Sequence, residues 1–294
     1  CWNATATATV TENAAPNAGT NGTLAICSNG ASTSLLARLG GTPTAGGTWS
    51  GPSAVVGGNY DPATMAAGAY TYTVVGTAPC TNATATVTVT ENAAPNAGAN
   101  GTLTVCSSGV AVGLATGLGG TPDAGGTWSG PSAVVGGNYD PATMAPGVYT
   151  YTVTGVAPCT NATSTVTVAE TGSPDAGTDG ANTVCENGAA VALFAQLGGT
   201  PDAGGAWSGP SAVLGGNYDP VTMAPGVYTY TLTATAPCVS DQSTVTVTEN
   251  AAADAGTNGT LTVCETGSAV ALISSLGGTP DAGGTWSGPS AVVG

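Results

Sequence analysis

The sequence predicts an all-β protein in which one β-sandwich module is repeated in tandem. The first observation is a fixed period: the passage GGTWSGPSAVVGGNYDP at 46–62 recurs letter for letter at 125–141. Equivalent residues in successive copies lie 79 positions apart, as Trp49 and Trp128 do. A constant period with almost no insertion indicates one folding unit copied along the chain. The second observation is that short Val-, Tyr- and Thr-rich runs are separated by Gly, Pro, Asn and Asp, which is typical of strands and turns.

The period divides the chain into five parts. Residues 1–13 are predicted to be the end of a preceding module and residues 251–294 the first part of a further one. Between them lie three complete β-sandwich modules, at 14–92, 93–171 and 172–250. We therefore expect the native polypeptide to continue at both ends.

The second module shows the expected elements in order. After the linker AAPNAGANG, the predicted strands lie in TLTVC, VAVGLATGLGG, GGTWSG, SAVVGGNYD, GVYTYTVTG and TNATSTVTV. Alternation is clearest where Tyr149, Tyr151 and Val153 share one face of a strand. In the third module, LFAQLGG predicts one additional helical turn closed by Gly198. Six or seven short strands in fewer than a hundred residues predict an immunoglobulin-like plan.

Aromatic residues that recur once per module are the predicted core. Trp128 follows a Gly-Gly pair, at the place of the core tryptophan of such sandwiches, whereas a sugar-stacking role would require an exposed ring. Tyr149 begins the best strand and resembles a tyrosine corner, whose hydroxyl returns to the backbone upstream. The structural core residues predicted in this way are Trp49, Trp128, Trp207, Trp286, Tyr70, Tyr149 and Tyr228.

The charge balance excludes several classes of partner. Sixteen acidic residues stand against one basic residue, Arg38, and the formal net charge is −15. Nucleic-acid binding needs basic side chains that neutralise phosphates, and anionic membrane surfaces need them too. No apolar run approaches the roughly 20 residues of a membrane-spanning helix. We expect no nucleic-acid partner and no membrane insertion of this chain.

The residue types present also predict that this chain is not an enzyme. It contains no His and no Lys, so the usual general bases, Schiff-base amines and triads cannot be assembled. Carboxylates remain, and Asp61 with its equivalents Asp140 and Asp219 lies in the motif NYDP. An Asp-Pro pair after Gly-Gly-Asn is more simply a turn, in which the Asp side chain accepts a hydrogen bond from its own backbone.

Two cysteines per module at fixed positions predict disulfides and an oxidising compartment. A structural metal site would need a C-x-x-C motif or histidine, and the sequence has neither. Pairing within a module closes loops of 53 residues, each worth roughly 4 kcal/mol. The predicted pairs are Cys27–Cys80, Cys106–Cys159 and Cys185–Cys238. Two alternatives stay open: pairs 26 residues apart, such as Cys80–Cys106, and bridges between neighbouring modules.

Two passages carry a family resemblance: CETGSAVALISSLGGTPDAGGTWSG, and NYDPATMAPGVYTYTVTGVAPCTNATSTVTV. Together they resemble the PKD-like and immunoglobulin-like tandem repeats of giant secreted surface adhesins of the Bacteroidota, including those of gliding bacteria. The resemblance covers the whole chain. It implies export by the type IX secretion route and display on the cell surface as long, thin fibres.

The linkers between modules are candidate calcium sites. Each contains Asn or Asp beside Gly and follows a Glu, and oxygen ligands of this kind can hold Ca²⁺. The candidates are Glu170, Asp175 and Asp179, around the passage DAGTDG. The competing and favoured interpretation is a plain Asn-Gly or Asp-Gly turn with no cofactor.

Six N-x-[ST] sequons are candidate glycosylation sites. The favoured alternative is that Asn and Thr are simply abundant in turns and strands. The sequons lie at Asn3, Asn21, Asn82, Asn100, Asn161 and Asn258.

These observations combine into the expectation of a structural shaft for an extracellular, cell-surface adhesin or filament that serves surface attachment or gliding. Its expected partners are neighbouring modules of the same chain, external surfaces or polysaccharide, and other copies through strand edges, which no lysine protects. Two alternatives are a multivalent carbohydrate-binding array and the subunit of a non-covalently polymerised filament or sheath.

Overall fold

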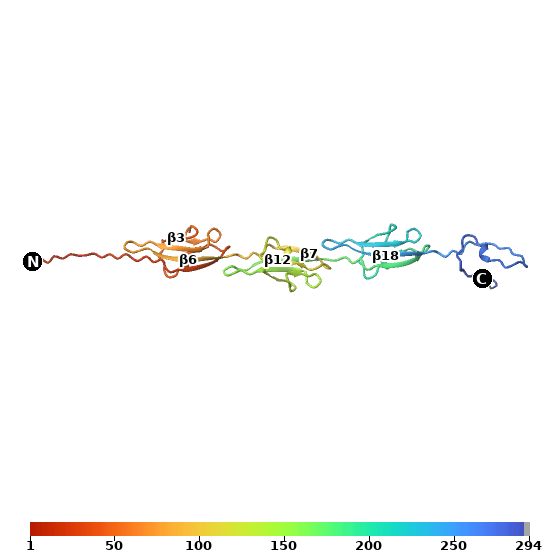
Figure 1. Cartoon of the computed structure of the whole chain (residues 1–294), viewed down its shortest axis with the longest axis horizontal. Coiled ribbons are helices and arrows are strands. Elements are labelled where there is room, and N and C mark those ends of the chain that lie inside the picture. The colour runs from red at the N-terminus through yellow and green to blue at the C-terminus, as the bar shows by residue number, and fades with distance from the viewer. Residues whose placement is uncertain (291–294) are drawn as a thin grey trace. The chain divides into compact units, whose positions relative to one another are not determined.

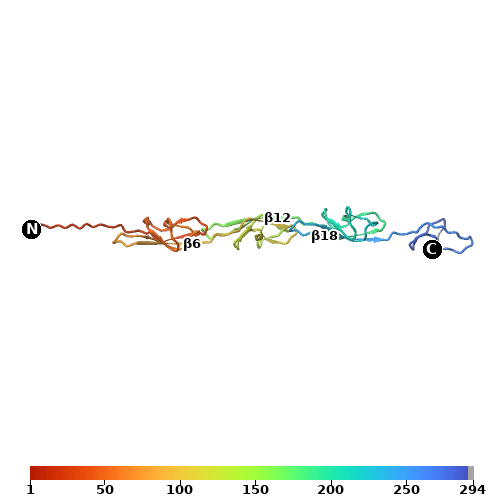
Figure 2. The same ribbon diagram turned by 90° about the horizontal axis from the view of Figure 1, so that it is seen from above.

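The computed structural model describes residues 1–290 and shows an all-β protein with three successive immunoglobulin-like β-sandwich modules (Figure 1). Residues 1–171 form one compact unit and residues 172–294 a second, and each unit is described by itself. The ten-residue strands β6, β12 and β18, labelled in Figure 2, are the longest strand of each module.

The first module contains a four-stranded sheet in the order β1-β6-β5-β3 and a two-stranded sheet of β2 and β4. β1 runs parallel to β6, whereas the other pairs are antiparallel. The order β6-β5-β3 corresponds to the G, F and C strands of an immunoglobulin domain. The elements are β1 (Gly22–Cys27), β2 (Thr33–Ser34), the 3-10 helix η1 (Leu36–Arg38), β3 (Thr48–Ser50), β4 (Asn59–Tyr60), β5 (Gly68–Val74) and β6 (Ala83–Asn92).

The second and third modules repeat this arrangement strand for strand. The second consists of β7 (Gly101–Cys106), β8 (Val112–Gly113), η2 (Leu114–Gly117), β9 (Thr127–Ser129), β10 (Asn138–Tyr139), β11 (Gly147–Val153) and β12 (Ala162–Thr171). The third consists of β13 (Gly180–Cys185), β14 (Val191–Ala192), η3 (Phe194–Gln196), β15 (Ala206–Ser208), β16 (Asn217–Tyr218), β17 (Gly226–Leu232) and β18 (Asp241–Asn250).

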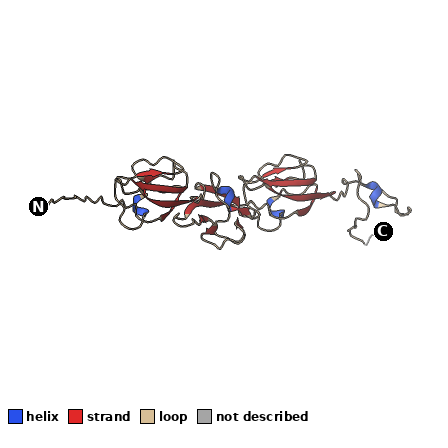
Figure 3. Cartoon of the chain, turned by 60° about the vertical axis from the view of Figure 1, so that its left-hand side comes forward, coloured by secondary structure: helices blue, strands red, loops and turns tan. Residues whose placement is uncertain are grey.

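The fourth unit, defined here as residues 251–290, differs from the three modules. It contains the 3-10 helix η4 (Leu272–Ser275) and one isolated bridge between Thr257 and Gly277. Within 251–290 no strand forms, as the absence of red arrows near the C-terminus in Figure 3 shows.

The predicted alternation along β11 is confirmed. Tyr149, Tyr151 and Val153 are buried, whereas the intervening Thr150 and Thr152 are only half-buried. Val166 and Val168 of β12 bury the same face of the sheet. The Thr-rich sequence therefore forms a sheet with one face directed to the core.

The centre of each core is a pair of tyrosines and not the predicted tryptophan. In the second module, Tyr139 and Tyr149 are fully buried, with ring centroids 5.6 Å apart in an edge-to-face arrangement. Trp128 is half-buried at the border of this core and packs against Tyr151 at 4.9 Å. Its strand, β9, has three residues and lies at the sheet edge, so the indole is only partly covered. The expectation of a buried core anchor is corrected in this way for Trp49, Trp128 and Trp207, and Trp286 is 43% exposed.

The predicted tyrosine corner is confirmed in all three modules. The hydroxyl of Tyr149 donates a hydrogen bond to the carbonyl of Ala145 at 2.7 Å. Tyr70 and Tyr228 make the same bond to the carbonyl four residues upstream. The hydroxyl thereby satisfies a carbonyl at the entry to the strand while the ring remains in the core.

The predicted helical turn in the third module is present as η3, but Gly198 does not close it. Leu197 ends the turn in an extended conformation, and Gly198 forms a bridge with Thr178. The left-handed residue is Gly199, at φ +76°. Gly198 is instead held by pairing with the linker.

Candidate functional site at the module junction

Two strands of the first module end side by side where the chain enters the second module. β1 and β6 are parallel, so Cys27 lies opposite Asn92 in the strand register. The backbone N–H of Ser28 donates to the carbonyl of Asn92 at 2.9 Å and continues the pairing by one residue. The parallel arrangement thus places the first cysteine of a module at its exit end.

The second module contributes the loop between β11 and β12, residues 154–161. The N–H of Cys159 donates to the carbonyl of Val156 at 2.9 Å, and the N–H of Gly155 donates to Oδ1 of Asn161 at 3.1 Å. The peptide bond between Ala157 and Pro158 is cis. These contacts hold Cys159 in a compact turn whose cysteine is 8% exposed.

A disulfide joins Cys27 to Cys159 and links the two modules covalently. The two Cα atoms are 5.0 Å apart although the residues are separated by 132 positions. Cys106 and Cys238 are disulfide-bonded as well. Cys80 and Cys185 have no disulfide partner.

The prediction that cysteines pair within a module is therefore wrong. The bridge that forms joins neighbouring modules, which was one of the two alternatives left open. Cys27 lies beside the last residue of β6, whereas Cys80 lies in the loop that precedes its first. The ten residues of β6 span about 30 Å. A disulfide tolerates a Cα separation of at most roughly 7 Å. The predicted Cys27–Cys80 pair would have to cross the length of its own module.

Hydrogen bonds reinforce the covalent link. Nδ2 of Asn92 donates to the carbonyl of Ala157 at 2.7 Å, and the N–H of Ala94 donates to Oγ of Ser28 at 2.9 Å. The sulfur of Cys159 lies 3.4 Å from the carbonyl oxygen of Asn92. We call this set of residues, Cys27, Ser28, 91–94 and 154–161, the junction. It ties the segment between the two modules to both of them.

The same contacts recur at the amino-terminal end of the first module. Nδ2 of Asn13 donates to the carbonyl of Ala78 at 2.8 Å, and the sulfur of Cys80 lies 3.7 Å from the carbonyl oxygen of Asn13. Asn13 and Cys80 are one period upstream of Asn92 and Cys159. The docking geometry is thus a property of the repeat and forms without the disulfide.

A pair made of a buried tyrosine and a half-buried glutamate lies immediately behind the junction. Tyr60 donates to Oε2 of Glu91 at 3.0 Å, and Tyr139 and Tyr218 make the same bond to Glu170 and Glu249. Burial, then the hydrogen bond to Glu91 and its negative charge, raise the pKa of Tyr60 to about 12. The same causes raise the pKa values of Tyr139 and Tyr218.

These three tyrosines were not among the predicted core or site residues, although each stands in NYDP, 31 residues before its glutamate. Of the three glutamates, Glu170 was a candidate calcium ligand, although a plain turn was the favoured interpretation of that linker.

The calcium candidates have separate partners. The carboxylate of Glu170 accepts from Tyr139, Oδ1 of Asp175 accepts from the N–H of Gly177, and Oδ1 of Asp179 accepts from the N–H of Thr244. Asp175 forms an Asx turn with Gly177, whereas the predicted Asp-Gly turn does not form, because Gly180 of the pair Asp179–Gly180 begins β13. Within residues 1–290 no three His, Cys, Asp or Glu side chains are grouped as a metal site requires.

Asp61 and the sequon asparagines also have structural roles. Oδ1 of Asp61 accepts from the N–H of Ala63 at 3.0 Å, which confirms the predicted turn.

Four sequon side chains accept backbone N–H groups through Oδ1 and hold a loop or a strand. These are Asn21, Asn82, Asn100 and Asn161. The equivalents in the third module, Asp179 and Ser240, accept in the same way, so an oxygen acceptor is what these positions require. Glycosylation, at these four sites or at Asn3 and Asn258, stays a prediction.

None of the helices among residues 1–290 has the length and the apolar character that spanning a membrane requires.

Comparison with models of known families finds no match for this chain, and comparison with curated proteins finds none. Among solved structures, the I-band fragment I67–I69 from titin is 14% identical, with 79% of this chain and 97% of the fragment covered and a TM-score of 0.38. An E-to-A variant of the same three domains is 15% identical, at the same coverage, with a TM-score of 0.40. Sidekick-1 immunoglobulin domains 1–5 are 12% identical over 80% of this chain and 60% of that one, with a TM-score of 0.30. All three consist of consecutive immunoglobulin domains.

Proposed function

We propose that this chain acts as a load-bearing shaft in an extracellular, cell-surface adhesin or filament. The observation that supports this proposal is the disulfide between Cys27 and Cys159, which crosses the junction between two successive modules. A bond within one module would stabilise that module alone. A bond across a junction instead carries tension from one module to the next.

The path of tension follows from the connectivity. A pull applied between Ala14 and Gly172 reaches Cys27 and passes through the disulfide to Cys159. Residues 28–158 lie inside the closed loop, so they are not extended by this pull. The loop contains β2 to β6 of the first module and β7 to β11 of the second. The strands inside this loop can therefore unfold without increasing the distance between Cys27 and Cys159, which the disulfide holds.

The compartment and the biological setting belong to the same proposal. Disulfides persist in oxidising compartments, which supports an extracellular location. The resemblance to surface-adhesin repeats of the Bacteroidota supports display on a cell exterior and a role in attachment or gliding. In this proposal the chain is not an enzyme, and its partners are neighbouring modules and external surfaces.

The multivalent carbohydrate-binding array is the less favoured function. A sugar platform needs an exposed aromatic face. In the three modules, each tryptophan packs on a tyrosine of the adjacent strand at 4.9 to 5.1 Å. The indole ring is therefore already engaged by the fold.

Single-molecule stretching of the full chain, with handles attached at Ala14 and Gly172, tests the proposal. The oxidised chain should reach full extension about 450 Å earlier than the reduced chain, because the 132 residues spanned by the disulfide remain closed. Cys27→Ser should extend like the reduced chain. Cys185→Ser, at an exposed and unbonded cysteine, is the matched control and should behave like the oxidised chain. Equal extension before and after reduction would show that the bridge bears no load and would overturn the proposal.

A further inference from the structure

We propose that each module binds one neutral sugar unit of an extracellular polysaccharide, in a polar pocket beside its NYDP motif. The inference goes beyond the load-bearing role and does not depend on it. It concerns a different place from the tryptophans, whose indole rings are engaged by the fold. It rests on a cavity that recurs at equivalent residues in two modules and on the hydrogen-bonding groups that line it.

The cavity has a volume of about 380 Å³ in the first module and about 270 Å³ in the second. These volumes lie near the lower limit of small-molecule sites, roughly 300 Å³, and suit one sugar ring. We call the cavity the NYDP pocket. In the first module its shared lining residues are Val56, Asn59, Asp61, Thr64 and Met65. Their equivalents in the second are Val135, Asn138, Asp140, Thr143 and Met144. The third module has Leu214, Asn217, Asp219, Thr222 and Met223 at these positions.

The turn at NYDP fixes Asp61 but uses only one of its carboxylate oxygens. Oδ1 accepts from the N–H of Ala63, and the backbone carbonyl accepts from the N–H of Met65 at 2.9 Å. Among residues 1–290 no group donates to Oδ2 of Asp61. In the second and third modules, a threonine hydroxyl donates to the equivalent oxygen at 3.0 and 2.9 Å. A hydroxyl can therefore reach Oδ2 at this place, and a sugar hydroxyl offers the same group.

The asparagine of the pocket supplies both donors and an acceptor. Asn59 is exposed, and β4 fixes its backbone by pairing with β2. Within the described residues 1–290, the side chains of Asn59, Asn138 and Asn217 have no hydrogen-bond partner. A primary amide offers two N–H donors and one carbonyl acceptor. Adjacent ring hydroxyls of a sugar can use these groups together.

An apolar side chain stands at the rim of the pocket on a rigid turn. Gly57 and Gly58 have φ values of +64° and +75°, the positive pair that a type I′ turn requires. Val56, which precedes them, is 84% exposed, and its equivalent Leu214 is 83% exposed. The rim thus stays apolar although the residue type changes. It can pack against the C–H groups of a sugar ring while the polar groups bind its hydroxyls.

The mixture of donors and acceptors selects against ions. An anion needs donors and is repelled by the pocket carboxylate and by the net charge of −15. A metal cation needs a group of acceptors, and within residues 1–290 no three His, Cys, Asp or Glu side chains meet. A neutral sugar uses donors and acceptors together and is not repelled by the charge of the chain.

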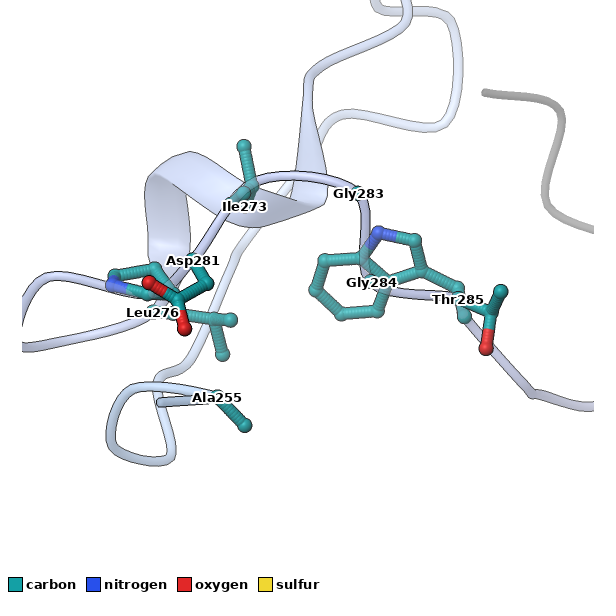
Figure 4. Close-up of a pocket in the computed structure, with 9 residues that line it drawn as sticks. Ala255, Ile273, Leu276, Asp281, Gly283, Gly284 and Thr285 are labelled. Atoms are coloured by element: carbon teal, nitrogen blue, oxygen red, sulfur yellow. The ribbon is translucent and has the colours of Figure 1, made fainter. Parts of the chain in front are cut away.

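A cavity of another kind lies in residues 251–290 and has a volume of about 290 Å³. Figure 4 shows Leu276 and Asp281 on one side of it and Gly284 and Thr285 on the other. Its walls are mainly apolar, whereas those of the NYDP pocket in the first module are mainly polar. It therefore lacks the character that suits a sugar.

Repetition would convert weak sites into firm attachment. A small, open pocket with few hydrogen bonds is expected to bind one sugar unit with a dissociation constant on the order of millimolar. Several such sites on one chain can bind the same polysaccharide, which raises the apparent affinity without any new contact.

Surface plasmon resonance of the full chain on immobilised polysaccharides tests the proposal. The neutral probes are dextran, mannan, galactan and β-glucan, and the anionic probes are alginate and heparin. We expect binding to at least one neutral probe and none to the anionic probes. The free methyl glycoside of the bound sugar should compete.

A triple variant tests the site itself by replacing the pocket asparagine of each module: Asn59→Ala, Asn138→Ala and Asn217→Ala. Binding should weaken at least tenfold, whereas thermal unfolding should stay unchanged because these amides have no partner in the fold. The matched control replaces one exposed serine per module outside the pocket: Ser50→Ala, Ser129→Ala and Ser208→Ala. It should bind within twofold of the unchanged chain.

Three results would overturn the proposal. The first is absence of binding to all four neutral polysaccharides. The second is equal binding by the asparagine variant and the unchanged chain. The third is binding that EDTA abolishes, which would assign the site to a metal cation. None of these measurements involves the disulfide, so their failure and the failure of the load-bearing role are distinguishable.

Discussion

The hydroxyl of Tyr60 donates a hydrogen bond to the carboxylate of Glu91, which directly precedes the last residue of β6. The pair connects the buried centre of the first module to its exit end, where Cys27 and Asn92 lie side by side. The same pair recurs in the second and third modules. The repeat therefore couples its core to its junction through one hydrogen bond per module.

This bond predicts loss of stability at alkaline pH. Folding raises the pKa of Tyr60 from 10.0 to about 12, so the folded state favours the neutral hydroxyl. The stabilisation is complete below pH 10 and is lost as the pH rises through about 12. Tyrosinate absorbance and circular dichroism, recorded together after pH jumps, should show Tyr60, Tyr139 and Tyr218 ionising only as the sheet is lost.

Tyr60→Phe is the control for the alkaline transition. It should lower stability at neutral pH by about 1 kcal/mol, through the lost hydrogen bond, and make the alkaline loss shallower. If three of the nine tyrosines did not titrate late in the unchanged chain, the tyrosine–glutamate pair would play no part in alkaline unfolding.

The disulfide predicts a specific peptide map. Digestion without reduction should release Cys27 and Cys159 in one linked peptide. Cys27→Ser should lower the unfolding free energy by up to about 5 kcal/mol in the chain-entropy model, because the closed loop spans 132 residues. Cys185→Ser should leave thermal unfolding unchanged. Recovery of Cys27 linked to Cys80 would instead restore pairing within the module.

The tyrosine corner predicts a moderate loss in one module. Tyr149→Phe removes the donor to the carbonyl of Ala145 and should cost about 1 to 2 kcal/mol, measured by denaturant unfolding. Val148→Ala, on the opposite and 51% exposed face of β11, is its control and should change stability by less than about 0.5 kcal/mol. Equal effects of the two substitutions would argue against the corner.

The core predicts a larger loss at the 3-10 helix. Leu114 is fully buried, so Leu114→Ala should cost about 2 to 5 kcal/mol through the lost contacts and the remaining cavity. Val110→Ala, 84% exposed in the preceding loop, should be close to neutral. A fluorescence-monitored denaturant titration distinguishes the two outcomes.

The order of residues along the chain was sufficient to predict the repeated all-β modules and their main strands. Tyr149, Tyr151 and Val153 alternate with threonines, and this period of two decides which face is buried wherever the strand pairs. The tyrosine corner could also be predicted, because its hydroxyl bonds to a carbonyl only four residues away. Interactions of this kind join residues close in sequence, so they can be predicted from the spacing of residues along the chain.

Only the tertiary structure decided which distant residues meet. Cys27 pairs with Cys159 because β1 lies parallel to β6 and places this cysteine at the exit end of its module, a direction that spacing along the chain does not reveal. Glu170 accepts a hydrogen bond from Tyr139, and Trp128 lies at the border of the core. Both results depend on sheet order and strand length, because these determine which side chains are covered. Sequence alone determined the module and its repetition, whereas the pairing of strand ends determined how one module is joined to the next.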